Sequence, residues 1–339
     1  MTRQLDLFSD DASKVPSVAL PDCPHAQAGR IPKRGRMIIS ASKRTDIPAF
    51  YLPWLIKRIE AGWVDVPNPV YRNAEDPLKA LTHVSLLPKD VLAIVWWSKN
   101  YGVYERFHKR FEAYENQYFH FTINSDRPDL AFIEPDVPPV VDALKQVKFL
   151  KNLRGGDMIA WRYDPLVFWN DRTTGEALST WDAEFFARMC QKLSDEGVTK
   201  CFTSFADHFL KFRQRVQSFF PKVELRTQTD DETREIVGEM HRIAGRYGMF
   251  VFPCTENDMA AYGESDGTTP GFMREDGACI DGRLFSDKRK LRTASDSQMK
   301  GREDCACSKH LDIGDYVTQE CGYGCMYCYA NPNHRKFKN

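Results

Sequence analysis

The sequence lacks several features that would place it quickly in one class of protein. It has no run of about 18 apolar residues, so none of its 339 residues is expected to cross a membrane. Lysine and arginine total 47, as do aspartate and glutamate. The resulting net charge of zero argues against a general polyanion binder, although a local basic groove remains compatible with it. The first residues, MTRQLDLFSDDASK, lack the basic-then-apolar order of a signal peptide, and we therefore expect a cytoplasmic protein.

Two nucleotide-binding motifs are also missing, and cysteine is sparse. No G-x-G-x-x-G follows an expected strand and no P-loop occurs, which disfavours a Rossmann fold. Ten cysteines in 339 residues are too few for a disulfide scaffold. Half of them fall between residue 305 and the end of the chain: Cys305, Cys307, Cys321, Cys325 and Cys328. In a cytosolic protein such clustering indicates a metal or iron–sulfur site.

A repeated pattern of strand and helix signals fills the middle of the chain. Six short apolar runs end in polar residues, at 37–39, 91–97, 118–124, 158–166, 201–209 and 249–258. Segments with helical spacing of apolar residues lie between them, at 51–62, 103–117, 140–153, 182–197 and 232–248. The segments 51–62 and 182–197, for example, end on a glycine, Gly62 and Gly197, as helices commonly do. Strands that alternate with helices predict parallel βαβ units.

The sequence therefore predicts an α/β fold, a full or partial (β/α) barrel of about six parallel strands. Ligands of such folds bind at the carboxyl ends of the strands, where the polar residues of this chain gather. We expect three parts: a flexible arm over 1–35, a barrel-like catalytic domain over 36–289, and a cysteine-rich cluster-binding segment over 290–339. The last part is short of aliphatic residues, which predicts an irregular segment organised by a metal.

The most specific motif is Cys321-x3-Cys325-x2-Cys328 in the string CGYGCMYCYAN. Three thiolates on a glycine-containing loop can bind three irons of a 4Fe-4S cluster and leave the fourth iron open, whereas an electron-transfer cluster uses four cysteines. Cys305 and Cys307 lie upstream and could bind a second metal or supply a fourth ligand. The alternative is a tetrahedral zinc site, although only Cys325 and Cys328 have the paired spacing that zinc sites favour.

The cysteine motif resembles the signature of radical S-adenosylmethionine enzymes. The string CGYGCMYCYAN is especially similar to the spore photoproduct lyase branch, and the strings WWSKN, HFTIN and WRYDPL resemble strand-end elements of that branch in the same order. More closely, ISASKRTDIPAFY, WRYDP and CACSKHLDIGDY resemble a widespread bacterial family of unassigned function, over about residues 36–331. One departure is large, because these enzymes usually carry the cysteine loop after the first strand. Here the C-terminal segment must fold back over the barrel to supply it.

The resemblance implies a fold, cofactors and partners. It implies a full or partial barrel in which Cys321, Cys325 and Cys328 hold 4Fe-4S, with Cys305 and Cys307 as further metal candidates. S-adenosylmethionine binds the open iron, and an electron donor such as flavodoxin or ferredoxin supplies the electron that produces a 5′-deoxyadenosyl radical. A lyase or other radical reaction on a nucleic-acid base lesion or modified base, as in DNA repair, is the implied activity.

Residues at the strand ends are the remaining site candidates. Those expected to bind the cofactor are Ser98, Lys99, Asn100, Thr122, Asn124, Arg162, Asp164 and Glu256, and those expected to bind substrate are Ser42, Lys43, Arg44 and Asp46. Arg162 and Asp164 could form an ion pair, and the planar guanidinium suits a cofactor carboxylate. Asp46 could instead cap the next helix. Asp207 and Cys254 are the catalytic candidates, Cys254 as a hydrogen donor. Cys190, Cys201 and Cys279 are expected to be core or surface thiols.

Two other function classes stay open at this point. The first is a non-catalytic, zinc-stabilised protein that binds nucleic acid or another protein. Basic stretches at 33–36 and 286–292 and the tail HRKFKN could contact phosphates, although a solvated charge run explains them as well. The second is a barrel hydrolase or lyase with a structural metal site, which no Ser-His-Asp order or paired-carboxylate spacing supports.

Overall fold

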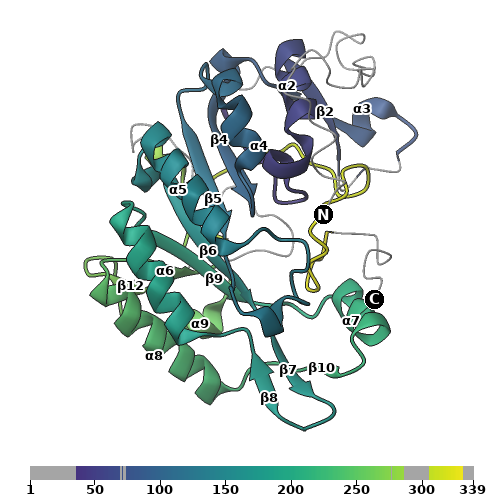
Figure 1. The fold of residues 1–339 in the computed structure, drawn as a ribbon. Helices are drawn as coiled ribbons and strands as arrows, with labels where there is room; N and C mark the ends of the chain where they lie inside the picture. Colours follow the sequence, from purple (N-terminus) through teal and green to yellow (C-terminus); the bar gives the residue numbers. More distant parts are fainter. Residues whose placement is uncertain (1–35, 69–70, 72–73, 276, 286–304, 331–339) are drawn as a thin grey trace.

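The computed structural model of the chain describes residues 36–68, 71, 74–275, 277–285 and 305–330. Their main feature is an eight-stranded sheet with the order β12-β11-β9-β6-β5-β4-β1-β13, in which each neighbouring pair is parallel (Figure 1). The strands are β1 (Met37–Ala41), β4 (Val91–Ser98), β5 (Gln117–Thr122), β6 (Ile159–Leu166), β9 (Lys200–Phe205), β11 (Phe250–Pro253), β12 (Gly271–Phe272) and β13 (His310–Asp312).

The six predicted strands are all present, and two short edge strands extend the sheet. From β1 to β12 the strands follow one another in sequence order, so every crossover advances in the same direction, as in a (β/α) barrel and not as in a doubly wound sheet. Within the described residues no ladder joins β12 to β13, so the sheet forms a partial barrel. This confirms the predicted fold class.

Helices pack along the outer face of the sheet, where α5, α6 and α8 lie side by side (Figure 1). The helices are α2 (Leu52–Ala61), α3 (Pro77–Ala80), α4 (Gly102–Phe107), α5 (Val140–Arg154), α6 (Ala183–Asp195), α7 (Leu210–Phe219), α8 (Asp230–Arg246) and α9 (Asn257–Ala261). Local chemistry sets several of their ends. Asp182 caps α6, Thr229 and Glu232 form a capping box at the start of α8, and Gly62 ends α2 in the left-handed conformation, with a φ of 81°.

Shorter elements complete the described structure. A π-helix, η2 (Ile47–Tyr51), follows β1, and 3-10 turns occupy η3 (Pro88–Asp90), η4 (His108–Phe111), η5 (Pro128–Leu130), η6 (Gly156–Met158) and η7 (Gly282–Leu284). Two small antiparallel sheets were not predicted. One pairs β2 (Trp63–Pro67) with β3 (Leu81–Ser85), and the other joins β10 (Val223–Leu225), β7 (Phe168–Asp171) and β8 (Ala177–Ser179).

The predicted helix over 103–117 is wrong in its second half. Helix α4 ends at Phe107, η4 continues to Phe111, and Gln117 begins strand β5 opposite Ile94 of β4. The buried Gln117 amide explains this end point, because its oxygen accepts hydrogen bonds from Trp96 and Tyr104. A buried amide that binds two core side chains favours the strand over continued helix.

The apolar core has two layers, one on each face of the sheet. Ile39, Trp96 and Trp161 are among the side chains that face the helices, and together with helix residues they form the larger cluster. Ile38, Val95 and Phe202 belong to the smaller cluster on the concave face. Because successive strand residues point to opposite faces, the alternation of neighbours such as Ile38 and Ile39 produces both layers.

The C-terminal segment joins the main sheet and then folds back over it. Strand β13 pairs with the free edge of β1, with Ile39 opposite Leu311, so the segment expected to be irregular contributes a strand. Its last described residues run between the region of α2 and helix α7 (yellow in Figure 1). The predicted arm over 1–35, the basic stretch 286–292 and the tail HRKFKN lie outside the described residues, as does most of the stretch 33–36. In the part of the chain that is described, no helix is both long and apolar enough to span a bilayer.

Candidate active site

A cavity of about 300 Å³ opens at the carboxyl ends of the central strands. Polar residues near the ends of β4, β6 and β9 and just after β1, β4, β9 and β11 line one side of it, and the cysteine loop lines the other. Of the predicted site residues, the lining includes Ser42, Lys43, Arg44, Asp46, Ser98, Lys99, Thr122, Arg162, Asp164, Asp207, Cys254, Glu256, Cys305, Cys307, Cys321, Cys325 and Cys328. Residues at opposite ends of the sequence therefore share one cavity, as the fold-back of the C-terminal segment requires.

Two glycines shape the loop that carries Cys321, Cys325 and Cys328. Gly324 has a φ of 65°, which a residue with a side chain adopts only with strain. Gly322 lies so close to the Phe50 ring that an added Cβ would come within 2.7 Å of a ring carbon. The Tyr51 hydroxyl donates to the carbonyl of Glu320 at 2.7 Å, which fixes the start of the loop on η2.

Arg215, on helix α7, holds the loop from the opposite side. Its Nη1 donates to the backbone carbonyls of Cys325 at 3.1 Å, Met326 at 2.5 Å and Cys328 at 3.1 Å. The Arg215 side chain is fully buried, and burial lowers the pKa of its guanidinium. No local sequence pattern predicts this contact, because Arg215 lies 110 residues before Cys325.

A buried ion pair joins the end of β4 to the same loop. Lys99 Nζ lies 2.8 Å from Oε1 of Glu134, and the Tyr327 hydroxyl donates to the same carboxylate oxygen. Burial alone would lower the pKa of Lys99, but the negative charge of Glu134 and nearby groups outweighs it and raises that pKa. Sequence reasoning missed Glu134, since a single carboxylate in a loop carries no recognisable pattern.

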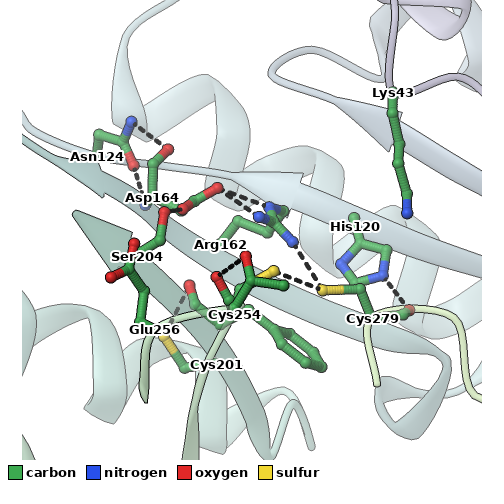
Figure 2. Close-up of polar contacts among 12 residues, drawn as sticks. Lys43, His120, Asn124, Arg162, Asp164, Cys201, Ser204, Cys254, Glu256 and Cys279 are labelled. Carbon is green, nitrogen blue, oxygen red and sulfur yellow. Dashed lines mark hydrogen bonds and ion pairs between the residues drawn. The ribbon is translucent and has the colours of Figure 1, made fainter. Parts of the chain in front are cut away.

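Arg162 and Asp164 form the predicted ion pair at the end of β6. The guanidinium binds Oδ2 of Asp164, and its Nη1 lies 3.3 Å from the sulfur of Cys279 (Figure 2). Ser204, from β9, donates to the other oxygen of Asp164. The Arg162 guanidinium also lies over the Trp97 ring, 5.2 Å from its centroid, and this ring stacks on His120. These contacts thus fix the position of the Arg162 guanidinium on the concave side of the sheet.

Two carboxyl groups of the cavity have raised pKa values. Burial, the charges of Asp207 and Asp164, and the neighbouring Cys254 raise the pKa of Glu256 to about 8, against one opposing hydrogen bond from the Phe205 amide. Burial likewise raises the pKa of Asp46 to about 6, although Ser98 and two backbone amides donate to its oxygens. Near neutral pH, Glu256 therefore carries a proton in much of the population.

Residues of the C-terminal segment bind the loop that follows β1. The carboxylate of Asp312 accepts hydrogen bonds from Ser40 at 2.8 Å, from Ser42 at 2.6 Å and from the Lys43 amide at 2.8 Å. Arg44 donates to the carbonyl of Gly314 at 3.1 Å. Among the predicted substrate-binding residues, Ser42 therefore has a clear structural role, and Asp46 caps η2 by accepting from the Ala49 amide.

Two predicted cofactor-binding residues lie behind the cavity wall. The Asn100 side chain accepts from the Gly102 amide and from Gln146, and it supports the start of α4. The Asn124 side chain binds Glu134, both backbone groups of Asp164 and the Tyr327 hydroxyl. Both amides are occupied by protein groups. Asp207 lines the cavity and is exposed, which puts it at the rim.

Cys279, expected to be an ordinary thiol, belongs to a group of four. Its sulfur lies 3.4 Å from that of Cys254, and the thiols of Cys305 and Cys307 lie beside it in the same cavity (Figure 2 shows Cys254 and Cys279). The other expected core thiols, Cys190 and Cys201, are buried on the helix-covered face. Within the described residues, no three His, Cys, Asp or Glu side chains are already arranged around one point as metal ligands.

Burial governs the protonation of Cys321 and Cys325 in the loop. It raises the pKa of the Cys321 thiol to about 12 and shifts that of Cys325 in the same direction, in the latter case against the attraction of Lys99. Both are neutral thiols in the protein without a bound cation. A metal ion reverses this preference, because only the thiolate binds it.

A comparison with known families covers most of the chain. The sequence model of a domain of unknown function, DUF1848, matches residues 38–330, which include all of the described strands but the first residue of β1. The chain belongs to the DUF1848 family. This confirms the expected membership of a family without an assigned function. No curated protein matches the chain. The DUF1848 match includes both the strand-end residues and the cysteine loop, so the whole cavity lies within the family domain.

Proposed function

We propose that this protein is a radical S-adenosylmethionine enzyme whose cluster-binding loop lies at the C-terminal end of its domain. The observation that carries the proposal is the position of Cys321, Cys325 and Cys328. All three line the cavity at the carboxyl edge of a parallel sheet, together with residues of β4 and β6 and residues that follow β11. In α/β folds this edge is where ligands bind.

The donor set fits an iron–sulfur cluster with one open iron. Three cysteines on one loop provide three thiolates, and Arg215, Tyr51 and the two glycines hold that loop against the barrel. When bound, the cluster and S-adenosylmethionine supply one-electron cleavage of the cofactor to a 5′-deoxyadenosyl radical, which abstracts hydrogen from a substrate. An electron-transfer cluster would use a fourth cysteine ligand.

Residues of the cavity are suited to hold the polar parts of such a cofactor. Arg162 presents a planar guanidinium, fixed by Asp164, that suits a carboxylate. Glu256 can accept from, or donate to, an amine or hydroxyl group according to its proton. The buried Nε1 of Trp97 has no hydrogen-bond partner among the described residues and is available as a donor. Trp97, Phe205 and Tyr329 add apolar lining that limits access of water to a radical.

The substrate class in this proposal is a damaged or modified nucleic-acid base. It comes from the resemblance of CGYGCMYCYAN to the spore photoproduct lyase branch. A separate experiment tests it. Base-modified oligonucleotides are added as substrates, and the release of 5′-deoxyadenosine should be faster with them than without any substrate.

The test uses the full chain purified without oxygen and reconstituted with iron and sulfide. We expect about four irons and four sulfides in the Cys321–Cys328 loop, and release of 5′-deoxyadenosine with dithionite and S-adenosylmethionine. Cys325→Ala should abolish both, whereas the matched control Cys190→Ala, a buried thiol on helix α6, should retain both. The zinc-stabilised alternative would instead be established if the chain bound zinc that is lost when Cys321, Cys325 and Cys328 are replaced, and if S-adenosylmethionine were not cleaved.

A further inference from the structure

Four thiols outside the cluster loop form a continuous chain of contacts in the same cavity. The sulfurs of Cys254 and Cys279 lie 3.4 Å apart. The Cys307 sulfur accepts a hydrogen bond from the Ile280 amide at 3.5 Å, and the thiols of Cys279 and Cys305 lie close enough to Cys307 to interact with it. All four residues line the cavity. The order of contact is thus Cys254, Cys279, Cys307 and Cys305.

Three separate segments bring these thiols together. Cys254 directly follows β11, near one edge of the main sheet, and Cys305 and Cys307 precede β13 at the other edge. Cys279 lies between them in a segment that crosses the concave face, where the His120 ring contacts its carbonyl at 2.6 Å. The amide of Ser308 donates to the carbonyl of Ile280 at 2.7 Å, which joins the last two segments.

The surroundings suit a site of concentrated negative charge. Cys279 and Cys307 are only 2% and 3% exposed. Nη1 of Arg162 lies 3.3 Å from the sulfur of Cys279, and the positive charge of Lys43 acts on Cys305 and Cys307. Figure 2 shows the Lys43 side chain extending to the region of His120 and Cys279. Lys43 offsets part of the net negative charge that a divalent ion with four thiolates carries, while Arg162, which is paired with Asp164, donates a hydrogen bond to the Cys279 sulfur.

We propose that Cys254, Cys279, Cys305 and Cys307 bind a second metal, as a closed site of four thiolates around a single tetrahedral ion of the zinc class. With Zn–S bonds of about 2.3 Å, the sulfurs of a tetrahedral site are about 3.8 Å apart, which is close to the observed contact. The ligand sulfurs of a 4Fe-4S cube stand farther apart, since a whole cluster separates them. Binding one Zn²⁺ converts the four thiols to thiolates, and the displaced protons pass to solvent.

This assignment changes the role of two predicted residues. Cys254, expected to be a hydrogen donor, becomes a metal ligand, and Cys279 changes from an ordinary thiol to a ligand. Cys305 and Cys307 remain metal candidates, but for a site separate from the Cys321 loop. The metal would tie the end of β11 to the segment before β13 and so hold the open side of the partial barrel together. The site does not depend on the proposed radical chemistry.

The test measures zinc, iron and sulfide in the full chain with Cys321, Cys325 and Cys328 all replaced by alanine. We expect one zinc per chain, with an X-ray absorption spectrum at the zinc edge that fits four sulfur ligands. A further Cys305→Ala change should remove most of the zinc. The matched control adds Cys190→Ala and Cys201→Ala instead, two buried thiols on the helix-covered face, and should keep the zinc.

A second measurement avoids variants of the site, because their folding could depend on the metal. The wild-type chain is treated with a mercurial reagent while zinc release is followed with an indicator dye, and one zinc should appear. Three results would overturn the proposal. The first is that the chain with Cys321, Cys325 and Cys328 replaced binds no stoichiometric metal. The others are that these four cysteines bind iron and sulfide, or that freshly purified, metal-free protein contains a Cys254–Cys279 disulfide.

Discussion

The guanidinium of Arg215 donates a hydrogen bond of 3.1 Å to the backbone carbonyl of Cys325, and the same nitrogen reaches the carbonyls of Met326 and Cys328. One side chain of helix α7 therefore holds the backbone around two of the three loop cysteines. Hydrogen bonds from a charged donor to buried carbonyls are stronger than neutral ones, and their loss leaves the acceptors without compensation.

Replacing Arg215 should loosen the loop. We expect Arg215→Met to lower the free energy of unfolding by about 2–3 kcal/mol and to reduce the iron bound after reconstitution several-fold. Urea denaturation and iron analysis measure the two effects. Arg213→Met, at an exposed position of the same helix, is the control and should leave both unchanged. Full iron content in Arg215→Met would show that the loop does not need this contact.

The close approach of Gly322 to Phe50 gives a prediction with a built-in rescue. In Gly322→Ala the new Cβ would lie 2.7 Å from a carbon of the Phe50 ring, so the loop must move away from η2. We expect iron content to fall by more than half. Combining this change with Phe50→Leu, which removes the ring, should restore much of the iron. Loss of iron without any recovery in the double variant would mean that the glycine is needed for another reason.

The buried pair of Lys99 and Glu134 should show strong coupling. Removing one partner leaves the other charge buried, so we expect Lys99→Met and Glu134→Gln each to destabilise the fold by about 3 kcal/mol. The double variant should cost less than the sum of the two, with a coupling energy of about 1–3 kcal/mol. Urea denaturation of the three variants measures this.

A surface ion pair provides the control for this comparison of single and double variants. Lys145 and Asp142 on α5 lie at the same 2.8 Å separation, but their side chains are 73% and 46% exposed. Their coupling energy should not exceed about 0.5 kcal/mol, because water and salt screen exposed charges. Equal coupling energies for the two ion pairs would contradict the role of burial.

Glu232 should make stability depend on pH near the start of α8. The Arg226 hydrogen bond lowers the pKa of this carboxyl below its ordinary value of 4.5. A carboxyl whose pKa is lower in the folded than in the unfolded protein stabilises the fold above pH 4.5, and this contribution disappears as the pH falls through the lowered value.

The variant Glu232→Gln tests this sign. At pH 7 it should be less stable than the wild type by about 0.5–1 kcal/mol, and the difference should shrink as the pH drops below 4.5. Unfolding by urea at several pH values measures the difference. Glu235→Gln, at an exposed position of the same helix, should show no such trend. A difference that grows toward acid pH would refute the assignment.

Local patterns in the sequence predicted the repeating part of the fold. Apolar runs such as 91–97 and 158–166 and the spacing of the segment 182–197 identify strands and helices, because side-chain periodicity decides which residues can face a core. The placement of Arg162 and Asp164 at a strand end followed from the same pattern, and the ion pair was confirmed. The short strands β12 and β13 were missed, because two or three residues carry too little periodicity.

Local patterns in the chain establish the order of the βα units, the presence of three closely spaced cysteines, and the residues that end each strand. Which of these residues meet follows only from the folded structure. Cys254 and Cys279, 25 residues apart, are in contact, Asn124 lies behind the wall, and Arg215 binds a loop 110 residues away. The spacing of residues along the chain predicts which side chains are neighbours within one helix or strand. Contacts between distant segments depend on how the packed core and the paired strands carry each segment through space, and no local pattern records that path.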